Sequence, residues 1–197
     1  MPAIKAVDLE QVAALLSTSV REAGTLALLM LGAPINTWTK GESSPVSDAD
    51  IAVDRLLRER LNTMGPDIAW LSEESVDDPS RLAASHVWIV DPIDGTRAYL
   101  TGSADWAVSA ALVQNGRPII ACLYAPVTEE FFMAVANRGA TCNGAAIVTT
   151  SGASVADARI AGPRGLLDRL AVVAPPFTVL PRRGQGAAPA TAHAARR

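Results

Sequence analysis

The segment VWIVDPIDGT, residues 87–96, is an apolar run that ends in two closely spaced acids. Val87 to Val90 is rich in β-branched and aromatic residues, which is typical of a buried strand. Asp91 and Asp94 follow at its end, and the backbone carbonyl of Ile93 lies between them. Hard cations such as Mg²⁺ take oxygen ligands, so these groups can converge on the same ions. The segment therefore predicts a strand with a candidate cation site at its end.

The turn after this strand has a second possible role. Pro92 fixes φ, and Gly95 permits tight backbone geometry. A helix that begins at Gly95 or Thr96 would direct its free N–H groups to the same place, which suits a phosphate group. Asp, Pro and Gly are also common turn formers, so a plain strand-to-turn connection is the alternative interpretation of these six residues.

Two upstream segments add further acids. Trp70-Leu71-Ser72-Glu73-Glu74 ends an apolar run in two carboxylates, although a merely solvated strand end would look the same. Ser47 stands three residues before Asp50, which is the pattern of a helix N-cap and could be no more than that. Each segment taken singly has a structural explanation, and their order along the chain favours a functional one.

The remaining pattern predicts two helices and a sheet. Apolar residues recur at steps of three and four along one helix that ends near Gly32, at Leu9, Val12, Leu16, Val20, Ala23, Ala27 and Met30. A second helix follows Ser47, a loop is expected at 35–46, and strands are expected at 68–72, 87–90, 106–113, 118–124, 131–135 and 159–161. Asn115-Gly116 is a hairpin signal, so the strands around it should be antiparallel.

Composition limits the classes of function. The formal charge of −3 argues against a nucleic-acid polymer as partner, because such binding depends on clustered Lys and Arg. Two cysteines, Cys122 and Cys142, are weak evidence for a disulfide framework, so both are expected as reduced thiols in a cytoplasmic protein. Acids interrupt the apolar N-terminal pattern, and no long charge-free apolar run occurs, so neither a signal peptide nor membrane insertion is expected.

Together and in this order, the three acidic segments resemble the inositol monophosphatase superfamily of Mg²⁺-dependent, lithium-sensitive phosphatases. The resemblance covers about Lys40 to Ile147, and Asp-Pro-Ile-Asp-Gly-Thr after a Glu-Glu strand is its most specific part. It implies a layered α/β (α+β) fold in which two N-terminal helices pack on a mainly antiparallel sheet. It also implies direct hydrolysis of a small-molecule phosphate ester by an activated water.

The resemblance also implies roles for individual residues. Glu73, Asp91, the Ile93 carbonyl and Asp94 would hold Mg²⁺, and Glu73 would also serve catalysis. Thr96 and Asp50 match the pair that orients the attacking water, while the backbones of Gly95 and Thr96 would contact phosphate. Accessory positions are Lys40, Glu74 and Arg97, and a surface arginine is the alternative for the last.

The substrate is open between two branches of the superfamily. The segments Leu71-Ser72-Glu73-Glu74 and Tyr124-Ala125-Pro126-Val127 are more similar to 3'(2'),5'-bisphosphate nucleotidases than to inositol phosphatases. Arg97-Ala98-Tyr99 also differs from the Asn-Phe of many inositol enzymes. Adenosine 3',5'-bisphosphate is therefore the expected substrate, with inositol phosphate as the alternative.

The C-terminal sequence departs from the superfamily. The last 27 residues, from Ala171, contain no acid but four prolines, eight alanines and four arginines. The Trp-Asp motif of the superfamily's second α/β half is absent, so we expect a phosphatase-like domain at 1–170, an irregular tail at 171–197 and a missing second half. An alternative function is therefore that of an inactive, truncated chain that binds metal without turnover. A homodimer is a further open alternative for its assembly.

Overall fold

The computed structural model describes residues 8–41, 44–149, 151 and 154–180. The chain divides into two compact units, 1–148 and 149–197, which are described separately. The boundary expected at 171 falls inside a helix, α4 (Arg164–Val173), so part of the segment expected to be irregular is helical. Positions 181–197 of the expected tail lie outside the described residues. The division into a phosphatase-like domain and a tail stays a prediction.

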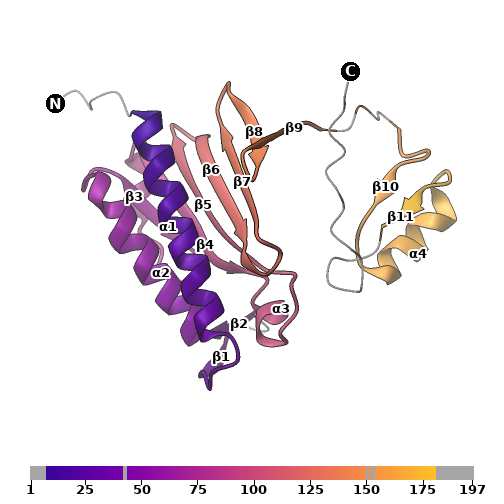
Figure 1. Ribbon diagram of the computed structural model, residues 1–197, viewed down its shortest axis with the longest axis horizontal. Coiled ribbons are helices and arrows are strands. Elements are labelled where there is room, and N and C mark those ends of the chain that lie inside the picture. The colour runs from indigo at the N-terminus through magenta and orange to yellow at the C-terminus, as the bar shows by residue number, and fades with distance from the viewer. Residues whose placement is uncertain (1–7, 42–43, 150, 152–153, 181–197) are drawn as a thin grey trace. The chain divides into compact units, whose positions relative to one another are not determined.

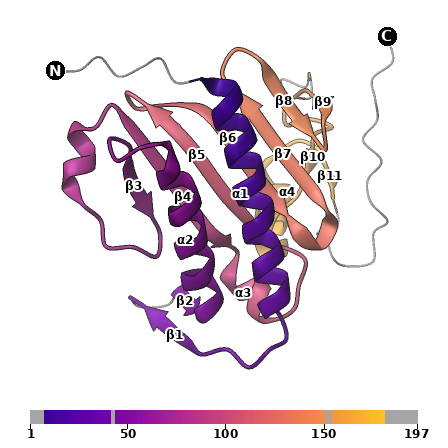
Figure 2. The same cartoon turned by 60° about the vertical axis from the view of Figure 1, so that its left-hand side comes forward.

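The first unit places two helices on one face of a sheet (Figures 1 and 2). The helices are α1 (Leu9–Met30) and α2 (Asp48–Leu61), as the sequence predicts. The seven-stranded sheet has the order β3-β4-β5-β6-β7-β8-β9. Its strands are β3 (Ala69–Ser72), β4 (His86–Asp94), β5 (Ala107–Gln114), β6 (Arg117–Ala125), β7 (Glu130–Val135), β8 (Gly139–Cys142) and β9 (Ala145–Ile147). The expected layered α/β fold with a mainly antiparallel sheet is confirmed.

Strand directions in this sheet follow from the connections. The β5–β6 hairpin turns at Asn115 and Gly116, whose φ angles of +48° and +77° are those of the tight turn that the sequence predicts. All neighbouring pairs from β4 to β9 are antiparallel. The pair β3–β4 is parallel, because a connection with a 3-10 turn at Pro79–Ala83 returns the chain to the edge where β3 began.

The core lies between the helices and the sheet. Side chains alternate along β4, so His86, Trp88 and Val90 are buried on the helix side while Ile89 is 41% exposed. The α1 residues in the core share one helix face: Val12, Leu16, Val20, Ala23 and Ala27. By length and composition α1 could cross a membrane, yet its apolar face is part of this core, as in the core helices of many globular proteins.

The start of α2 and the segment before it show one agreement and one difference. Asp50 accepts hydrogen bonds from the Ser47 backbone N–H at 2.8 Å and from its hydroxyl at 2.6 Å, so Ser47 is the expected N-cap residue and Asp50 completes a capping box. The loop expected at 35–46 is wrong in part, because β1 (Thr37–Lys40) pairs antiparallel with β2 (Ser44–Ser47). Threonine and tryptophan favour extended backbone, which explains the hairpin.

The second unit has a small sheet of its own. β10 (Arg159–Ile160), close to the strand expected at 159–161, pairs parallel with β11 (Thr178–Val179), and α4 lies between them in sequence. Leu167 of α4 is 6% exposed and is the one large hydrophobic side chain classed as buried among the described residues of this unit. The unit therefore has a very small core.

A candidate metal and phosphate site at the ends of two central strands

Parallel pairing brings two acidic strand ends together. Ser72 of β3 is paired with Val90 of β4, so Glu73 and Asp91 follow at neighbouring positions where the two strands end, which is called the acidic edge below. The Glu73 N–H donates to the Val90 carbonyl at 3.3 Å, which continues the ladder past the end of β3. Carboxylates from segments 18 residues apart in the chain thus come into contact through the sheet register.

The environment of the Asp91 carboxyl group favours its neutral form. Burial raises its pKa from 3.8 to about 7, and repulsion from Glu73 and Asp94 adds to the shift. A hydrogen bond between the side chains of Asp91 and Glu73 acts in the same direction, since two carboxyl groups can share a hydrogen bond only when one keeps a proton. A cation at this place would replace that proton.

A β-bulge shapes the turn that carries Asp94. The β4–β5 register shifts between Asp91 and Asp94, so the intervening residues leave the regular ladder. Ile93 is 2% exposed, and its carbonyl accepts a hydrogen bond from the Thr96 hydroxyl at 3.1 Å. Asp94 itself is exposed. The bulge thus places the buried Ile93 between Asp91 and Asp94.

Gly95 is required by the backbone after the bulge. Its φ of +92° is a left-handed conformation, and an added Cβ would lie 2.6 Å from the Asp105 carbonyl oxygen. The short helix α3 (Thr96–Leu100) begins at the next residue, as expected. Tyr99 fixes α3, because its hydroxyl donates to the Ala27 carbonyl of α1 at 2.9 Å and its ring packs edge-on against Trp106.

Asp50 connects α2 to this turn. The side chain is 1% exposed, and its Oδ1 accepts a hydrogen bond from the Thr96 hydroxyl at 3.1 Å. Its other oxygen is taken by the Ser47 N–H and hydroxyl. The two Ser47 donors fix the orientation of this buried carboxylate, and its Oδ1 offers the Thr96 hydroxyl an acceptor beside the Ile93 carbonyl.

Lys40 and Glu74 lie beside the Glu73 turn. The Lys40 ammonium donates to the Glu73 carbonyl and lies 3.9 Å from the Glu74 carboxylate, whose side chain is 8% exposed. Burial raises the pKa of Glu74, while the charge of Lys40 opposes that rise. The hairpin β1–β2 therefore supplies a cation next to the acidic edge.

The sequence matches a known family of proteins. The model of the inositol monophosphatase family matches residues 8–171, which is most of the chain. The chain belongs to the inositol monophosphatase family. The family resemblance found in the three acidic segments is confirmed.

The similar proteins include both bisphosphate nucleotidases and inositol monophosphatases. The chain is 36% identical over 108 residues to a 3'(2'),5'-bisphosphate nucleotidase CysQ of Shigella flexneri, which covers 53% of this chain and 43% of that protein. It is 38% identical over 113 residues to an inositol monophosphatase of Dictyostelium discoideum, covering 57% and 42%. The chain therefore spans less than half the length of the curated relatives that it matches.

A solved structure supports the fold. An IMPase/NADP phosphatase, crystallised with Mg²⁺ and phosphate, superposes with a TM-score of 0.75 at 22% identity and covers 88% of this chain and 68% of that one. At that identity the likeness shows the inositol monophosphatase fold alone.

The oxygen atoms of the proposed ligands are of the type that a hard cation binds. Glu73, Asp91 and Asp94 offer only oxygen, and their mutual repulsion, seen at Asp91, is what a divalent cation relieves. In the part of the chain that the structure describes, no three His, Cys, Asp or Glu side chains are already arranged as ligands. The exposed position of Asp94 fits this finding, since its side chain has room to turn. Metal binding by these residues stays a prediction.

One of the expected accessory residues lies on a helix and not at a strand end. Arg97 is exposed on α3, one residue after Thr96. Sequence reasoning also missed Asp54, which accepts hydrogen bonds from Ser72 and Ser75 on the two sides of Glu73-Glu74. The available signal was its position four residues after Asp50, on the same face of α2.

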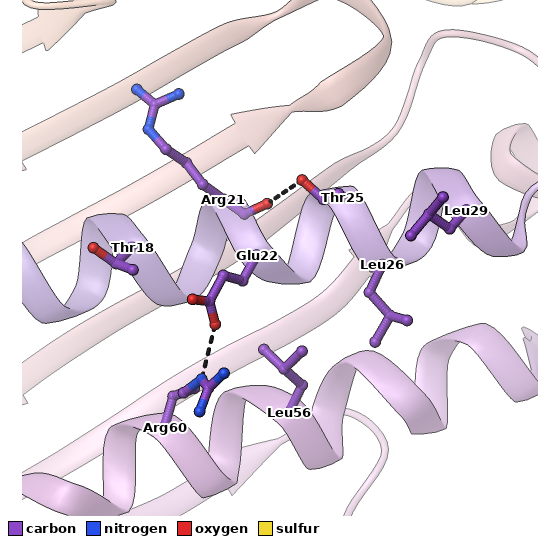
Figure 3. Close-up of a pocket in the computed structure, with 8 residues that line it drawn as sticks. All are labelled: Thr18, Arg21, Glu22, Thr25, Leu26, Leu29, Leu56 and Arg60. Atoms are coloured by element: carbon purple, nitrogen blue, oxygen red, sulfur yellow. Dashed lines mark hydrogen bonds and ion pairs between the residues drawn. The ribbon is translucent and has the colours of Figure 1, made fainter.

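A pocket of about 510 Å³ lies elsewhere in the first unit (Figure 3). It is open to solvent between α1 and α2, with leucines from both helices in its wall: Leu26, Leu29 and Leu56. Its charged residues include Glu22 and Arg60, whose side chains form an ion pair at 2.8 Å. Apolar walls and a paired charge do not suit a phosphate ester, so this pocket is not the candidate site.

Proposed function

We propose that the chain carries the catalytic residues of a Mg²⁺-dependent phosphate-monoester hydrolase. The observation that carries the proposal is the contact of Glu73 with Asp91 at the ends of β3 and β4, close to the Asp50–Thr96 hydrogen bond and to Asp94 in the same turn. Family membership supports it, because the relatives' names are those of phosphatases. Three separate segments carry the sequence patterns, and the fold brings them together. Both observations support hydrolysis of a phosphate monoester.

The proposed metal ligands are the carboxylates of Glu73, Asp91 and Asp94 and the carbonyl of Ile93. When bound there, Mg²⁺ would lower the pKa of the attacking water and would offset negative charge on the phosphate oxygens. The raised pKa of Asp91 supports this assignment, since protons and Mg²⁺ compete for the same oxygens.

The proposed role of Thr96 is to orient the attacking water. A hydroxyl has one proton, so Thr96 donates to Asp50 or to the Ile93 carbonyl, both at 3.1 Å. Its remaining lone pairs can accept a hydrogen bond from water, and the Glu73 carboxylate is the proposed acceptor of the proton that the water loses. Asp50 acts by holding the hydroxyl, and no covalent phosphoenzyme is needed.

Phosphate would be bound by the turn and its cationic neighbours. The backbone N–H groups at Gly95 and Thr96 point out of the start of α3, where a helix leaves such groups without intrahelical acceptors. Lys40, placed 3.9 Å from Glu74, adds positive charge, and Arg97 and Glu74 are accessory positions.

The proposed substrate is adenosine 3',5'-bisphosphate. Support comes from the motif around Leu71-Ser72-Glu73-Glu74 and from the nucleotidase relatives, at 36% identity. Inositol phosphate is the second candidate, because the inositol monophosphatase of Dictyostelium discoideum is 38% identical over a similar length. The two values are too close to separate the branches.

A different class of function is metal binding without turnover. It is the alternative because the chain spans less than half the length of those relatives, so their activity does not transfer to it directly. The cytoplasmic setting and the homodimer also remain proposals.

The test is a phosphate-release assay on the purified chain with both substrates, with Mg²⁺ and with excess chelator. We expect faster release from adenosine 3',5'-bisphosphate than from inositol 1-phosphate, inhibition by Li⁺, and a loss of about 100-fold in Thr96→Val, which keeps the shape but removes the hydroxyl. Turnover that persists in chelator would contradict the metal mechanism. Mg²⁺ binding without any turnover would favour the non-catalytic alternative.

A further inference from the structure

Asp54 of α2 makes contacts that the proposed mechanism does not use. Its Oδ1 accepts a hydrogen bond from the Ser72 hydroxyl, and its Oδ2 accepts one from the Ser75 hydroxyl at 3.3 Å. Ser72 is 6% exposed, and Asp54 and Ser75 are half-buried. One carboxylate therefore bridges the residues directly before and after Glu73-Glu74.

The two serine hydroxyls are fixed from their other side as well. Ser72 Oγ accepts a hydrogen bond from the Glu74 N–H at 3.3 Å, and Ser75 Oγ accepts one from the Trp70 indole N–H at 3.1 Å. Each hydroxyl donates to Asp54 and accepts from a group of the β3 segment, so both of its roles are filled. The turn is held at two points by a helix that is distant in sequence.

Asp50 and Asp54 are one helical turn apart, so they share a face of α2. Asp50 ties that face to Thr96 in the turn after β4, and Asp54 ties it to the turn after β3. The helix also packs on β4. A single rigid element is thereby connected to both of the segments that carry the proposed ligands.

We propose that Asp54 is a positioning residue that fixes the Glu73 turn so that the Glu73 carboxylate faces Asp91 before a cation binds. This inference rests on the proposed function, because it concerns the same site. Groups that orient a metal ligand without touching the metal typically change its affinity by about 10–100-fold when they are removed. Without Asp54, the cation itself would have to order Glu73. The entropy cost of that ordering would make cation binding less favourable.

The contact itself is tested in the metal-free chain by NMR of the tryptophan indole N–H groups. In Asp54→Ala the Trp70 resonance should shift, because Ser75 Oγ loses the acceptor that orients it, and Trp70→Phe assigns the signal. The matched control is Glu59→Ala, an exposed acid on the same helix, which should leave the resonance in place. An unchanged Trp70 signal in Asp54→Ala would overturn the inference whatever the chain does with metal.

The role is tested by calorimetric titration with Mg²⁺. We expect about tenfold weaker binding in Asp54→Ala, a smaller loss in Asp54→Asn, which keeps the shape and one acceptor, and no change in Glu59→Ala. The double variant Ser72→Ala/Ser75→Ala should be equally weak, and adding Asp54→Ala to it should change little, because Asp54 acts through those hydroxyls. Wild-type affinity in folded Asp54→Asn and Asp54→Ala would overturn this inference alone. A wild-type chain that binds no Mg²⁺ would instead overturn the proposed function and this inference with it.

Discussion

Asp91 in the first unit and Asp168 in the second are the same residue type in opposite situations. Asp91 is partly buried beside Glu73 and Asp94, and its pKa is raised to about 7. Asp168 projects from α4 with its side chain 68% exposed, and its partner Arg164, 3.8 Å away, is 91% exposed. Such a surface pair is strongly screened by water. The carboxylate thus acquires unusual chemistry from its packing and not from its type.

The packing differs because the two units bury very different amounts of apolar surface. The first unit has a continuous core between two helices and the sheet, and this core holds the acidic strand ends in place. In the described part of the second unit Leu167 is buried, while Val172 and Val173 of the same helix are more than 80% exposed. Burial is required before neighbouring charges can shift a pKa by much.

The largest expected effect separates the two aspartates by activity. Asp91→Asn keeps the size of the side chain but removes a proposed Mg²⁺ ligand, so Mg²⁺-dependent phosphate release should fall by about 10³-fold, equivalent to about 4 kcal/mol. Asp168→Asn should stay within about twofold of wild type, because exposed pairs contribute little. Initial rates at saturating Mg²⁺ measure both. Equal losses in the two variants would erase the proposed difference between the units.

A smaller effect is expected from two glycines. Gly95→Ala should lower the free energy of unfolding by about 2–4 kcal/mol, because its left-handed φ and the Asp105 carbonyl oxygen leave no room for a Cβ. Gly165→Ala in α4 meets no atom within 4 Å, so it should be neutral or slightly stabilising through helix propensity. Urea unfolding gives both values. Tolerance of Gly95→Ala would show that the turn before α3 is not under the constraint described.

The smallest expected effect is a pH dependence of stability in excess chelator. Folded Asp91 keeps its proton up to about pH 7, whereas the unfolded residue loses it near the ordinary pKa of 3.8. Between these values the folded state binds more protons, so rising pH should lower the free energy of unfolding, and Glu74, whose pKa is also raised, should act in the same direction.

Urea unfolding from pH 4 to 8 measures this decline. Asp91→Asn should reduce it, Asp168→Asn should retain it, and Mg²⁺ should oppose it by binding the folded state at high pH. A wild-type stability that rises across the window would contradict the burial and repulsion assigned to Asp91.

Much of the first unit could be predicted from local sequence. The Ser47 cap fixed the start of α2, and the Asn115-Gly116 turn predicted the β5–β6 hairpin, because both signals lie within a few neighbouring residues. The linear order of Glu73 and Asp91 at strand ends predicted an acidic edge, since each follows an apolar run. Family likeness then supplied roles that spacing alone could not.

The remainder depended on contacts between distant residues. The bridge from Asp54 to Ser72 and Ser75 spans 18 and 21 positions, and serine and aspartate on a surface have many other uses. The parallel pairing of β3 with β4 is set by the connection between them, not by either strand. The helix α4 was missed because its last residues run into a segment whose prolines and alanines resemble an irregular sequence in composition.

The position of α1 in the core has a consequence for the order of synthesis. Its apolar face packs against β5 and β6, and β5 begins at Ala107, roughly 80 residues after α1 ends at Met30. At about 5–20 residues per second, a ribosome needs on the order of 4–16 s to make that interval. During those seconds α1, whose length and composition would also suit a membrane span, has no sheet to cover it. In the nascent chain the face of α1 that packs on β5 and β6 therefore stays without that sheet until both strands are made, and slower translation lengthens this interval.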